Sequence, residues 1–510
     1  MKKKWVSLLL LAIFVFPFLL GQSPFDDWIS AAVEADRGGD FSDALRLYSE
    51  VLPYLRDSDD TQTVRKLQNR IFEMQKIQQE FPLDVQLFYE ELQRSFPHME
   101  KDAMDKILAN PRLESVQIDG KTFFFGGLIP NLRYRDRELF RTDHDALVRA
   151  RLFFLHTRDT ALQDDRWGLH PTFANPFTSP TTFLFRSGIH VSRDKLPASG
   201  TLQLWFPQPI LGASQKDVRL VAIQGEEFLG CTPRFDAELG IAYFEVPLEQ
   251  LQSDLELSLE TLVTSYRQQV AVDPANVGEY DDQDPEFLRY TASSGAIVFD
   301  ASLSETARLI VGDETNPYLQ AKKIYDYIVQ RIAYSDTPHM TLNSLDIEGN
   351  LRQPESLYVH RNGFGDTLGQ SAYFCALCRS LGIPARTTGG FQWIPSVEGP
   401  HYWAEFFLPR YGWVPADPAF AGFVDYFHDY EISASDKKRF QEFYFGGIDP
   451  YRMVVQKDLW LPLSPRNRQT VLLPIVLEFP QVNLEGESYS LDVATAIKDG
   501  YGYSFLPLSY

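Results

Sequence analysis

Hydrophobic and polar positions follow different periods along the chain, and each period predicts a different kind of structure. Residues up to about 110 show helical spacing, residues 183–275 alternate, and residues 290–460 mix the two patterns. In the alternating part, turn residues separate short apolar runs, which predicts an antiparallel β-sandwich. These runs are TLQLWF at 201–206, VRLVAI at 218–223, IAYFEV at 241–246 and LELSLETLV at 255–263. We therefore expect a multidomain α+β fold.

The helical beginning, residues 24–110, is expected to form a small module. Two short helices flank Gly38-Gly39, and helical sequence continues over about 60–80 and 84–108. Such a module either packs against the rest of the chain or docks a protein partner. Its first hairpin resembles a tetratricopeptide-like unit in the placing of Trp28, Ala32, Ala44, Tyr48 and Val51.

Residues 111–175 are expected to form a connecting α/β segment. ESVQIDGKTFFFG at 114–126 predicts a hairpin around Asp119-Gly120, and a helix is predicted near 144–156. The Pro- and Thr-rich stretch NPFTSPTT at 175–182 is expected to mark the boundary with the sandwich.

The mixed part of the chain begins with an amphipathic helix at 316–334, whose apolar residues are mostly three and four apart. A loop with little periodicity follows at 335–362, and long loops inside compact domains are often functional. GFGDTLGQSAYFCALCRSLGIPAR at 363–386 then predicts a glycine turn into one helix. Strands are predicted near 387–394, 402–408 and 413–416, and again in the C-terminal β segment 461–510, one of them at 471–479.

Composition and charge narrow the classes of function. The 510 residues are 44% hydrophobic and 14% aromatic, which is enough for well-filled cores and excludes a disordered chain. Because the formal net charge is −21, we expect no nucleic-acid partner and no attraction to an anionic membrane surface through bulk charge.

Residues 1–21 have the pattern of an export signal. Three lysines precede an apolar, uncharged run from Trp5 to Leu20, and Gly21 suits a cleavage site. The run is shorter than the roughly 20 residues of a spanning helix. The alternative is an uncleaved anchor, and a lipoprotein anchor is excluded because no cysteine follows the run. We expect an exported, periplasmic or extracellular protein that meets a membrane only if this segment stays uncleaved.

The three cysteines, Cys231, Cys375 and Cys378, do not make a disulfide framework. Cys375 and Cys378 have the spacing of a redox pair. However, they lie in the middle of the predicted helix on its apolar stripe, whereas redox thiolates sit at helix N-termini. We therefore interpret both as core thiols.

Three residues with possible catalytic roles occur in the order Thr367, His401 and Asp417. Thr367 starts the predicted helix, where backbone N–H groups and the helix dipole favour negative charge. His401 begins the strand HYWAEFF and Asp417 ends the next strand, so a hairpin brings them near each other. An acid in that place holds an imidazole in its useful tautomer.

The stretch from Asn316 to Phe420 resembles the core of the transglutaminase-like superfamily, whose fold is papain-like. The family pattern is Gly-x-Cys at a helix start, Gly-Ile-Pro-Ala-Arg after it, then His-x-Trp-x-Glu and Gly-Trp-x-x-x-Asp-Pro. Family members often carry a β-domain before this core, which fits residues 183–275. The matching segments are AKKIYDYIVQRIAY, GDTLGQSAYFCALCRSLGIPAR and HYWAEFFLPRYGWVPADPA.

The resemblance implies roles for single residues. His401 matches the family histidine, Asp417 the family acid, and the family cysteine falls on Thr367. Gly365 and Asp366 match the two residues before it and are expected to line the cleft. A threonine hydroxyl is not usefully ionised, and threonine nucleophiles typically use their own N-terminal amine as base, which an internal Thr367 lacks. We therefore expect a helix-start residue, with Asp366 or Thr367 itself as the cap.

Two further residues are expected to line the cleft of the family. Trp403 is one, although aromatic residues on paired strands more often fill a core. Glu405 is the other, because it shares a strand face with His401 and would support that residue.

Other side chains outside the pattern are interpreted more simply. Arg452, in YFGGIDPYRM at 444–453, is expected to form a salt bridge back to the core. His339 and His360 lack metal-ligand spacing and are interpreted as surface residues. We expect neither a metal nor a cofactor.

Three hypotheses for function follow. The first is an exported, catalytically impaired transglutaminase-like protein that binds a polypeptide or a cell-envelope component. The second is an amide-bond hydrolase or acyltransferase, with Thr367 as hydroxyl nucleophile, His401 as base and Asp417 as orienting acid; a Thr367 Oγ1 about 3 Å from a His401 nitrogen would support it. The third is an architectural envelope protein with an occluded cleft, for which Phe364 is the nearest plug.

Overall fold

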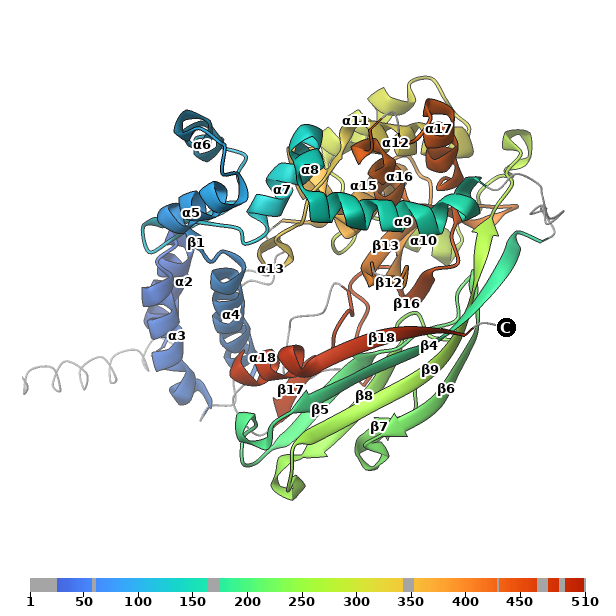
Figure 1. Ribbon diagram of the computed structural model, residues 1–510. Coiled ribbons are helices and arrows are strands. Elements are labelled where there is room, and N and C mark those ends of the chain that lie inside the picture. The colour runs from blue at the N-terminus through green and yellow to red at the C-terminus, as the bar shows by residue number, and fades with distance from the viewer. Residues whose placement is uncertain are drawn as a thin grey trace, which may run out of the picture. The chain divides into compact units, whose positions relative to one another are not determined.

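Helices come first along the chain, antiparallel sheets occupy the middle, and a mixed α+β region follows. The computed structural model describes residues 25–56, 61–162, 175–342, 353–395, 397–428, 431–465, 476–485 and 491–508 (Figure 1). The chain divides into two compact units, one ending at Leu128 and the other comprising most of the rest. The predicted export signal at 1–21 lies outside the described residues. None of the described helices is long and apolar enough to cross a membrane.

The first unit combines helices with one small sheet, and the helices predicted in this part are confirmed. Its helices are α2 (Asp26–Gly38), α3 (Phe41–Arg56), α4 (Thr61–Glu80), α5 (Val85–Ser95) and α6 (Lys101–Leu108). Its sheet has the order β1 (Leu83–Asp84), β3 (Lys121–Phe124), β2 (Ser115–Ile118).

Residues with positive φ form two turns of this unit. The hairpin predicted around Asp119-Gly120 is confirmed, and both turn residues have positive φ, 50° and 73°. Helix α2 ends at Gly39, whose φ is 81°. A Cβ on Gly39 would lie 2.9 Å from the carbonyl oxygen of Gln117, so glycine is required there.

A buried ion cluster ties α2 to α4. Arg70 donates from Nε and Nη2 to the two carboxylate oxygens of Asp36, at 2.6 and 2.7 Å, and from Nη1 to Glu73 at 2.9 Å. All three side chains are buried. Because a buried charge without its partner is costly, this cluster fixes how the two helices pack.

The antiparallel strands predicted between 183 and 275 are confirmed. They belong to two sheets, one with the order β15-β9-β4-β18 and with β6 beside β9, the other with the order β17-β5-β8-β7. Side chains from both sheets share one apolar core, for example Leu204, Phe244 and Leu257. The strands are β4 (Phe177–Val191), β5 (Thr201–Pro207), β6 (Gln215–Gln224), β7 (Leu229–Cys231), β8 (Ile241–Pro247), β9 (Leu255–Gln269), β15 (Gly447–Ile448), β17 (Gln481–Glu485) and β18 (Tyr501–Leu508).

The end of the chain completes these sheets. Strand β17 pairs with β5, and β18 runs antiparallel along β4 (Figure 1). Helix α18 (Leu491–Gly500) lies between them in sequence and places Ile497 in the shared core. The strand predicted at 471–479 is not found in its described part, because residues 476–480 are bends and coil and β17 begins only at Gln481.

The Pro- and Thr-rich stretch at 175–182 is largely strand rather than linker. Strand β4 begins at Phe177, and its pairing with β9 shifts register between Thr178 and Pro180. Ser179, with a φ of 49°, takes up the irregularity. A register shift is how a strand accommodates a proline that cannot donate to the ladder.

The mixed region places one helix against a four-stranded antiparallel sheet. The sheet has the order β14 (Gly412–Ala416), β13 (Gly399–Leu408), β12 (Ala385–Gln392), β16 (Arg452–Lys457). Helix α15 (Thr367–Ser380) packs against it, and every residue from Leu368 to Arg379 is buried. The predicted amphipathic helix is confirmed as α12 (Pro317–Arg331), capped by Asn316.

Further helices cover this core. The helix predicted near 144–156 is confirmed as α9 (His144–Leu162), and its Phe153 packs on Phe420 with ring centroids 3.9 Å apart. The remaining elements are α7 (Leu128–Arg135), α8 (Arg137–Thr142), α10 (Pro285–Thr291), α11 (Ala301–Val311), β10 (Ala333–Tyr334), α13 (His339–Leu342), α14 (Glu355–Asn362), β11 (Phe364–Gly365), α16 (Pro418–Gly422) and α17 (Ala434–Phe443).

Candidate active site

Helix α15 begins at a charged cap. The Asp366 carboxylate accepts a hydrogen bond from the N–H of Gly369 at 2.8 Å, so Asp366 rather than Thr367 caps the helix. Capping by a carboxylate satisfies an N–H group that has no partner within the helix, and it complements the positive end of the dipole. Gly365, one position earlier, is buried in the short strand β11.

Thr367 is the first residue of α15 and is partly exposed. Its carbonyl oxygen accepts a hydrogen bond from Ser371 Oγ at 2.7 Å, and the same hydroxyl lies 3.3 Å from the carbonyl oxygen of Tyr402. The N-terminal turn of α15 therefore lies beside the part of β13 that carries His401. Within the described residues, the Thr367 hydroxyl makes no hydrogen bond, neither to His401 nor to its own helix.

The predicted hairpin brings His401 and Asp417 together. Their Nε2 and Oδ2 atoms are 2.7 Å apart, and both side chains are buried. The register pairs Ala404 with Ala416, so Asp417 follows directly at the end of β14. Gly389 of β12 makes room for this arrangement, because a Cβ there would lie 2.5 Å from the carbonyl oxygen of His401.

The charge states of the pair follow from its surroundings. Burial lowers the pKa of His401 below its ordinary value; Asp417 opposes this and Arg452 adds to it. Burial alone would raise the pKa of Asp417, but His401 and Arg452 hold it below its ordinary value. At neutral pH the imidazole is therefore neutral and the carboxylate ionised. Because a carboxylate only accepts, the proton lies on Nε2 and the lone pair on Nδ1.

Arg452 completes the pair from β16, as expected from the sequence. Its Nη1 lies 3.1 Å from Asp417 Oδ2, and its Nη2 lies 2.7 Å from Asp449 Oδ2. Arg452, Asp417 and Asp449 have no exposed surface. The histidine and its acid thus belong to a buried ionic network that joins β13, β14 and β16.

Trp403 and Glu405, the two residues of β13 that are predicted to line a cleft, lie on the same face of the strand but have different partners. Trp403 is buried, and its ring is nearly parallel to that of His401 with centroids 6.4 Å apart. Glu405 is bonded to Arg386 at 2.8 Å and to Thr388 at 3.2 Å, not to His401. Glu405 therefore holds the strand pair β12–β13 together rather than supporting the histidine.

His339 has two buried or half-buried partners, although 37% of its own side-chain surface is exposed, so this surface residue is also ion-paired. It donates from Nδ1 to Glu355 Oε1 and from Nε2 to Asp366 Oδ2, both at 2.6 Å. Burial alone would lower the pKa of His339, but Asp366 and Glu355 raise it well above its ordinary value. An imidazolium thus bridges α14 to the cap of α15. His360 bonds to Ser302 and Tyr373 instead.

A second titratable group near this cap, Glu478, could not be recognised from the sequence either. Burial raises the pKa of Glu478 to about 7, while His339 lowers it and Asp366 raises it further. Sequence patterns carry no signal for this cluster, because its members come from α13, the cap of α15 and a segment close to β17.

The cysteines have no catalytic environment. Cys375 and Cys378 are buried in α15, and burial raises the pKa of both thiols. Their interpretation as core thiols is confirmed. In the part of the chain that the structure describes, no three His, Cys, Asp or Glu side chains are arranged to hold a metal ion.

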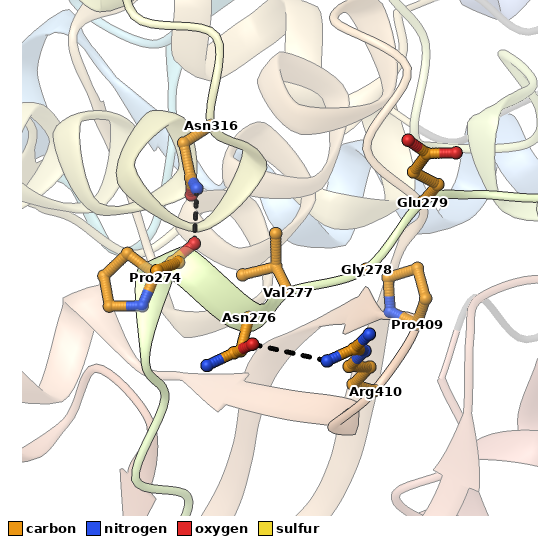
Figure 2. Close-up of a pocket in the computed structure, with 9 residues that line it drawn as sticks. Pro274, Asn276, Val277, Gly278, Glu279, Asn316, Pro409 and Arg410 are labelled. Atoms are coloured by element: carbon orange, nitrogen blue, oxygen red, sulfur yellow. Dashed lines mark hydrogen bonds between the residues drawn. The ribbon is translucent and has the colours of Figure 1, made fainter.

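A polar pocket of about 710 Å³ lies away from these residues, between the turn Pro274–Asn276 and Arg410. Figure 2 shows two bonds across it: Asn316 donates to the carbonyl oxygen of Pro274 at 2.7 Å, and Arg410 donates to Asn276 at 3.3 Å. The side chains of Asn276, Asn316 and Arg410 are thus engaged with neighbours, and we assign the pocket no role.

Comparison with known proteins identifies the family of this region. Residues 304–418 match the transglutaminase-like superfamily and form a domain of that superfamily. The match contains Thr367, His401 and Asp417, so the resemblance seen in the sequence is confirmed for this part of the chain.

The similar proteins and structures reported next are distant, and each covers only part of the chain; the first covers 44% of it. An uncharacterized protein of Haemophilus influenzae is 25% identical over 250 residues, and the chain spans only 64% of that relative's length. A candidate cysteine protease from Cytophaga hutchinsonii is 13% identical with a TM-score of 0.39, over 66% of this chain and 93% of that one. The periplasmic domain of TgpA from Pseudomonas aeruginosa is 13% identical with a TM-score of 0.25, over 51% and 92%. These two structures are too dissimilar to bear on the chemistry of this chain.

Proposed function

We propose that this chain binds polypeptide at the start of α15 and neither cleaves nor joins it. One observation carries the proposal. The residue at the family's nucleophile position is Thr367, and within the described residues its hydroxyl has no hydrogen bond to the neutral His401. A hydroxyl nucleophile needs a base within hydrogen-bond reach, about 2.6–3.2 Å away.

The helix N-terminus is also already occupied. In a thiol enzyme this end of the helix stabilises a thiolate and the oxyanion that follows it. Here the Asp366 carboxylate takes that place, held by Gly369 N–H and by His339. A second negative charge beside Asp366 would be repelled, which disfavours both thiolate-type and oxyanion chemistry.

The pair His401–Asp417 then has a structural role. Removing either partner would leave a charge or a polar atom unsatisfied inside the network with Arg452. The pair can therefore be present without catalysis. At this end of α15, Thr367 is the residue that a ligand can reach, because Leu368 to Arg379 are buried.

We also propose where the chain works and what it meets. The basic and then apolar pattern of residues 1–21 supports export, to the periplasm or outside the cell. Its ligand would be a polypeptide or another cell-envelope component there. The helices of the first unit would offer a second contact surface for a protein partner.

A second candidate function is an amide-bond hydrolase or acyltransferase that uses the Thr367 hydroxyl. The observation in its favour is the charge state of the pair. His401 is neutral, keeps a lone pair on Nδ1, and is held by an ionised Asp417, as a general base requires.

Binding is tested with a labelled, unfolded polypeptide. We expect fluorescein-labelled casein to bind the wild-type chain, as measured by fluorescence anisotropy. Thr367→Trp should weaken binding at least tenfold, because an indole covers the start of α15. The matched control is Thr232→Trp, which makes the same change at an exposed position outside this region. Casein that does not bind, or binds both variants equally, would refute the proposal and favour a purely architectural role.

A further inference from the structure

A cavity of about 340 Å³ lies where the sheet of the transglutaminase-like domain meets strands β4 and β9. Arg386 lines it, and Arg386 pairs in register with Glu405, four positions along β13 from His401. At roughly 3.3 Å per strand residue, Glu405 is about 13 Å from His401 along β13. Its walls are mostly apolar or aromatic, and its three long polar side chains are Gln268, Arg386 and Lys457.

One positive charge at this cavity is not balanced. The Lys457 ammonium group makes no hydrogen bond or ion pair with any residue that the structure describes. The nearby carboxylates each have another partner. Glu405 is paired with Arg386 at 2.8 Å, Glu238 with Arg289 at 2.9 Å, and Asp458 with Arg379 at 3.4 Å.

The surroundings of Lys457 disfavour its charged form. Burial lowers the pKa of Lys457, and Arg386 lowers it further, while Glu405 and Glu238 oppose the shift. An anion in the cavity would reverse this effect by favouring the charged ammonium group. The cavity is therefore electrostatically suited to a negative ligand.

Gln268 supplies a second polar group. Gln268 lines the cavity and is only 3% exposed as a residue, yet its side-chain amide forms no hydrogen bond with any described residue. Buried amides normally have partners, so an unbonded one facing a cavity indicates a missing acceptor or donor. At the apolar wall, the Arg386 guanidinium stacks on Trp413 at 3.9 Å from the ring centroid.

We propose that this cavity binds an organic carboxylate, with its charge on Lys457, a hydrogen bond from Gln268 and its apolar body against Phe177, Tyr411 and Trp413. One surplus positive charge matches a monoanion better than a doubly charged phosphate. The volume is near the lower end of the range of about 300–1,000 Å³ for small-molecule sites. The carboxylate could belong to a free small acid or to the C-terminus of a peptide.

The test is isothermal titration calorimetry of the purified full chain at pH 7. Phenylacetate represents the free acid and N-acetylphenylalanine the peptide C-terminus, and the amide of each is its neutral control. We expect at least one carboxylate to bind at least tenfold more tightly than its amide. Whichever acid binds more tightly identifies the source.

Variants locate the site. Lys457→Met should weaken carboxylate binding at least tenfold, whereas Lys438→Met, which removes a charge from the exposed face of α17, should change it less than twofold. If the melting transition shows that Lys457→Met does not fold, two other variants test the site. Lys457→Arg should keep carboxylate binding, and Gln268→Leu should weaken it severalfold.

Four outcomes overturn the proposal. They are no binding of either acid, equal binding of acids and amides, binding unchanged in the Lys457 and Gln268 variants, and inorganic phosphate binding as tightly as the acids. Binding here does not depend on whether Thr367 is a nucleophile, because Thr367→Trp leaves this cavity intact.

Discussion

Asp366 carries two interactions that together determine how α15 begins. One carboxylate oxygen accepts from Gly369 N–H, and the other accepts from the His339 imidazolium. Because His339 also donates to the buried Glu355, the cap connects α15 to α13 and α14. The residue before Thr367 is thus held by charge as well as by backbone geometry.

Replacing this cap should cost more than replacing an ordinary one. Asp366→Ala removes a helix cap and one partner of a charged histidine, so we expect a loss of about 2–4 kcal/mol in the free energy of unfolding. The control is Asp284→Ala, which removes an exposed cap from α10 and should cost about 1 kcal/mol. Urea denaturation measures both. Equal losses would show that the His339 bridge adds nothing.

The His339 bridge also predicts a pH dependence. Its pKa is raised in the folded state, so its stabilisation is complete below the unfolded value of about 6.5 and is lost as pH rises through the folded value. The stability difference between wild type and His339→Gln should therefore be largest near pH 6 and shrink toward alkaline pH. Urea denaturation at a series of pH values measures it; a difference that stays constant contradicts the bridge.

Some site residues could be predicted from the sequence and others could not. The proximity of His401 and Asp417 could be predicted, because a tight turn between two alternating strands determines which strand ends lie side by side. The ion pairs of His339 could not be predicted, because Glu355 and Asp366 belong to separate elements whose packing depends on tertiary contacts. Glu405 was placed on the correct strand face, but its partner Arg386 lies on another strand.

At the scale of elements, Arg452 is the link on which three strands depend. Its guanidinium group, on β16, forms an ion pair with Asp417 at the end of β14, and Asp417 is in turn bonded to His401 on β13. Asp417 also accepts from Phe420 N–H and so starts α16. Replacing Arg452 should therefore weaken the packing of β13, β14 and β16 against one another.

We expect Arg452→Met to cost about 3–5 kcal/mol, the usual result of leaving a buried charge without its partner. Arg234→Met, which breaks an exposed pair with Asp236, should leave the midpoint of urea denaturation unchanged. If Arg452→Met is as stable as wild type, the network is not what holds His401 in place.

Local sequence patterns identified most helices and strands, but not which strands pair with one another. The spacing at 316–334 identified α12, and the alternating runs identified β5, β6, β8 and β9, because burial of one face imposes those periods. Pairing of β17 and β18 with strands of the middle region could not be predicted, since it joins segments almost at opposite ends of the second unit. The sequence around Pro180 does not indicate a strand for the same reason, because the register shift that admits this proline into β4 depends on β9.

At the scale of the whole molecule, the chain consists of two compact units, each with its own buried arginine. Arg70 is paired in the first unit and Arg452 in the second. Two units with separate cores need not unfold in one step.

Differential scanning calorimetry should therefore resolve two transitions. Arg70→Met should lower the midpoint of one and leave the other unchanged, and Arg452→Met should do the reverse. A single transition that both variants shift by similar amounts would show that the units unfold together.

The central claim, a transglutaminase-like domain that has its histidine and acid but lacks a nucleophile, is tested most directly by activity. Wild type, Thr367→Cys and Thr367→Cys/His401→Ala are assayed for peptide-amide hydrolysis and for incorporation of a labelled amine. We expect no turnover by wild type or by the double variant, and only weak turnover by Thr367→Cys, because the Asp366 carboxylate beside it disfavours a thiolate. Turnover by wild type above the background of His401→Ala would contradict it and make Thr367 a working nucleophile.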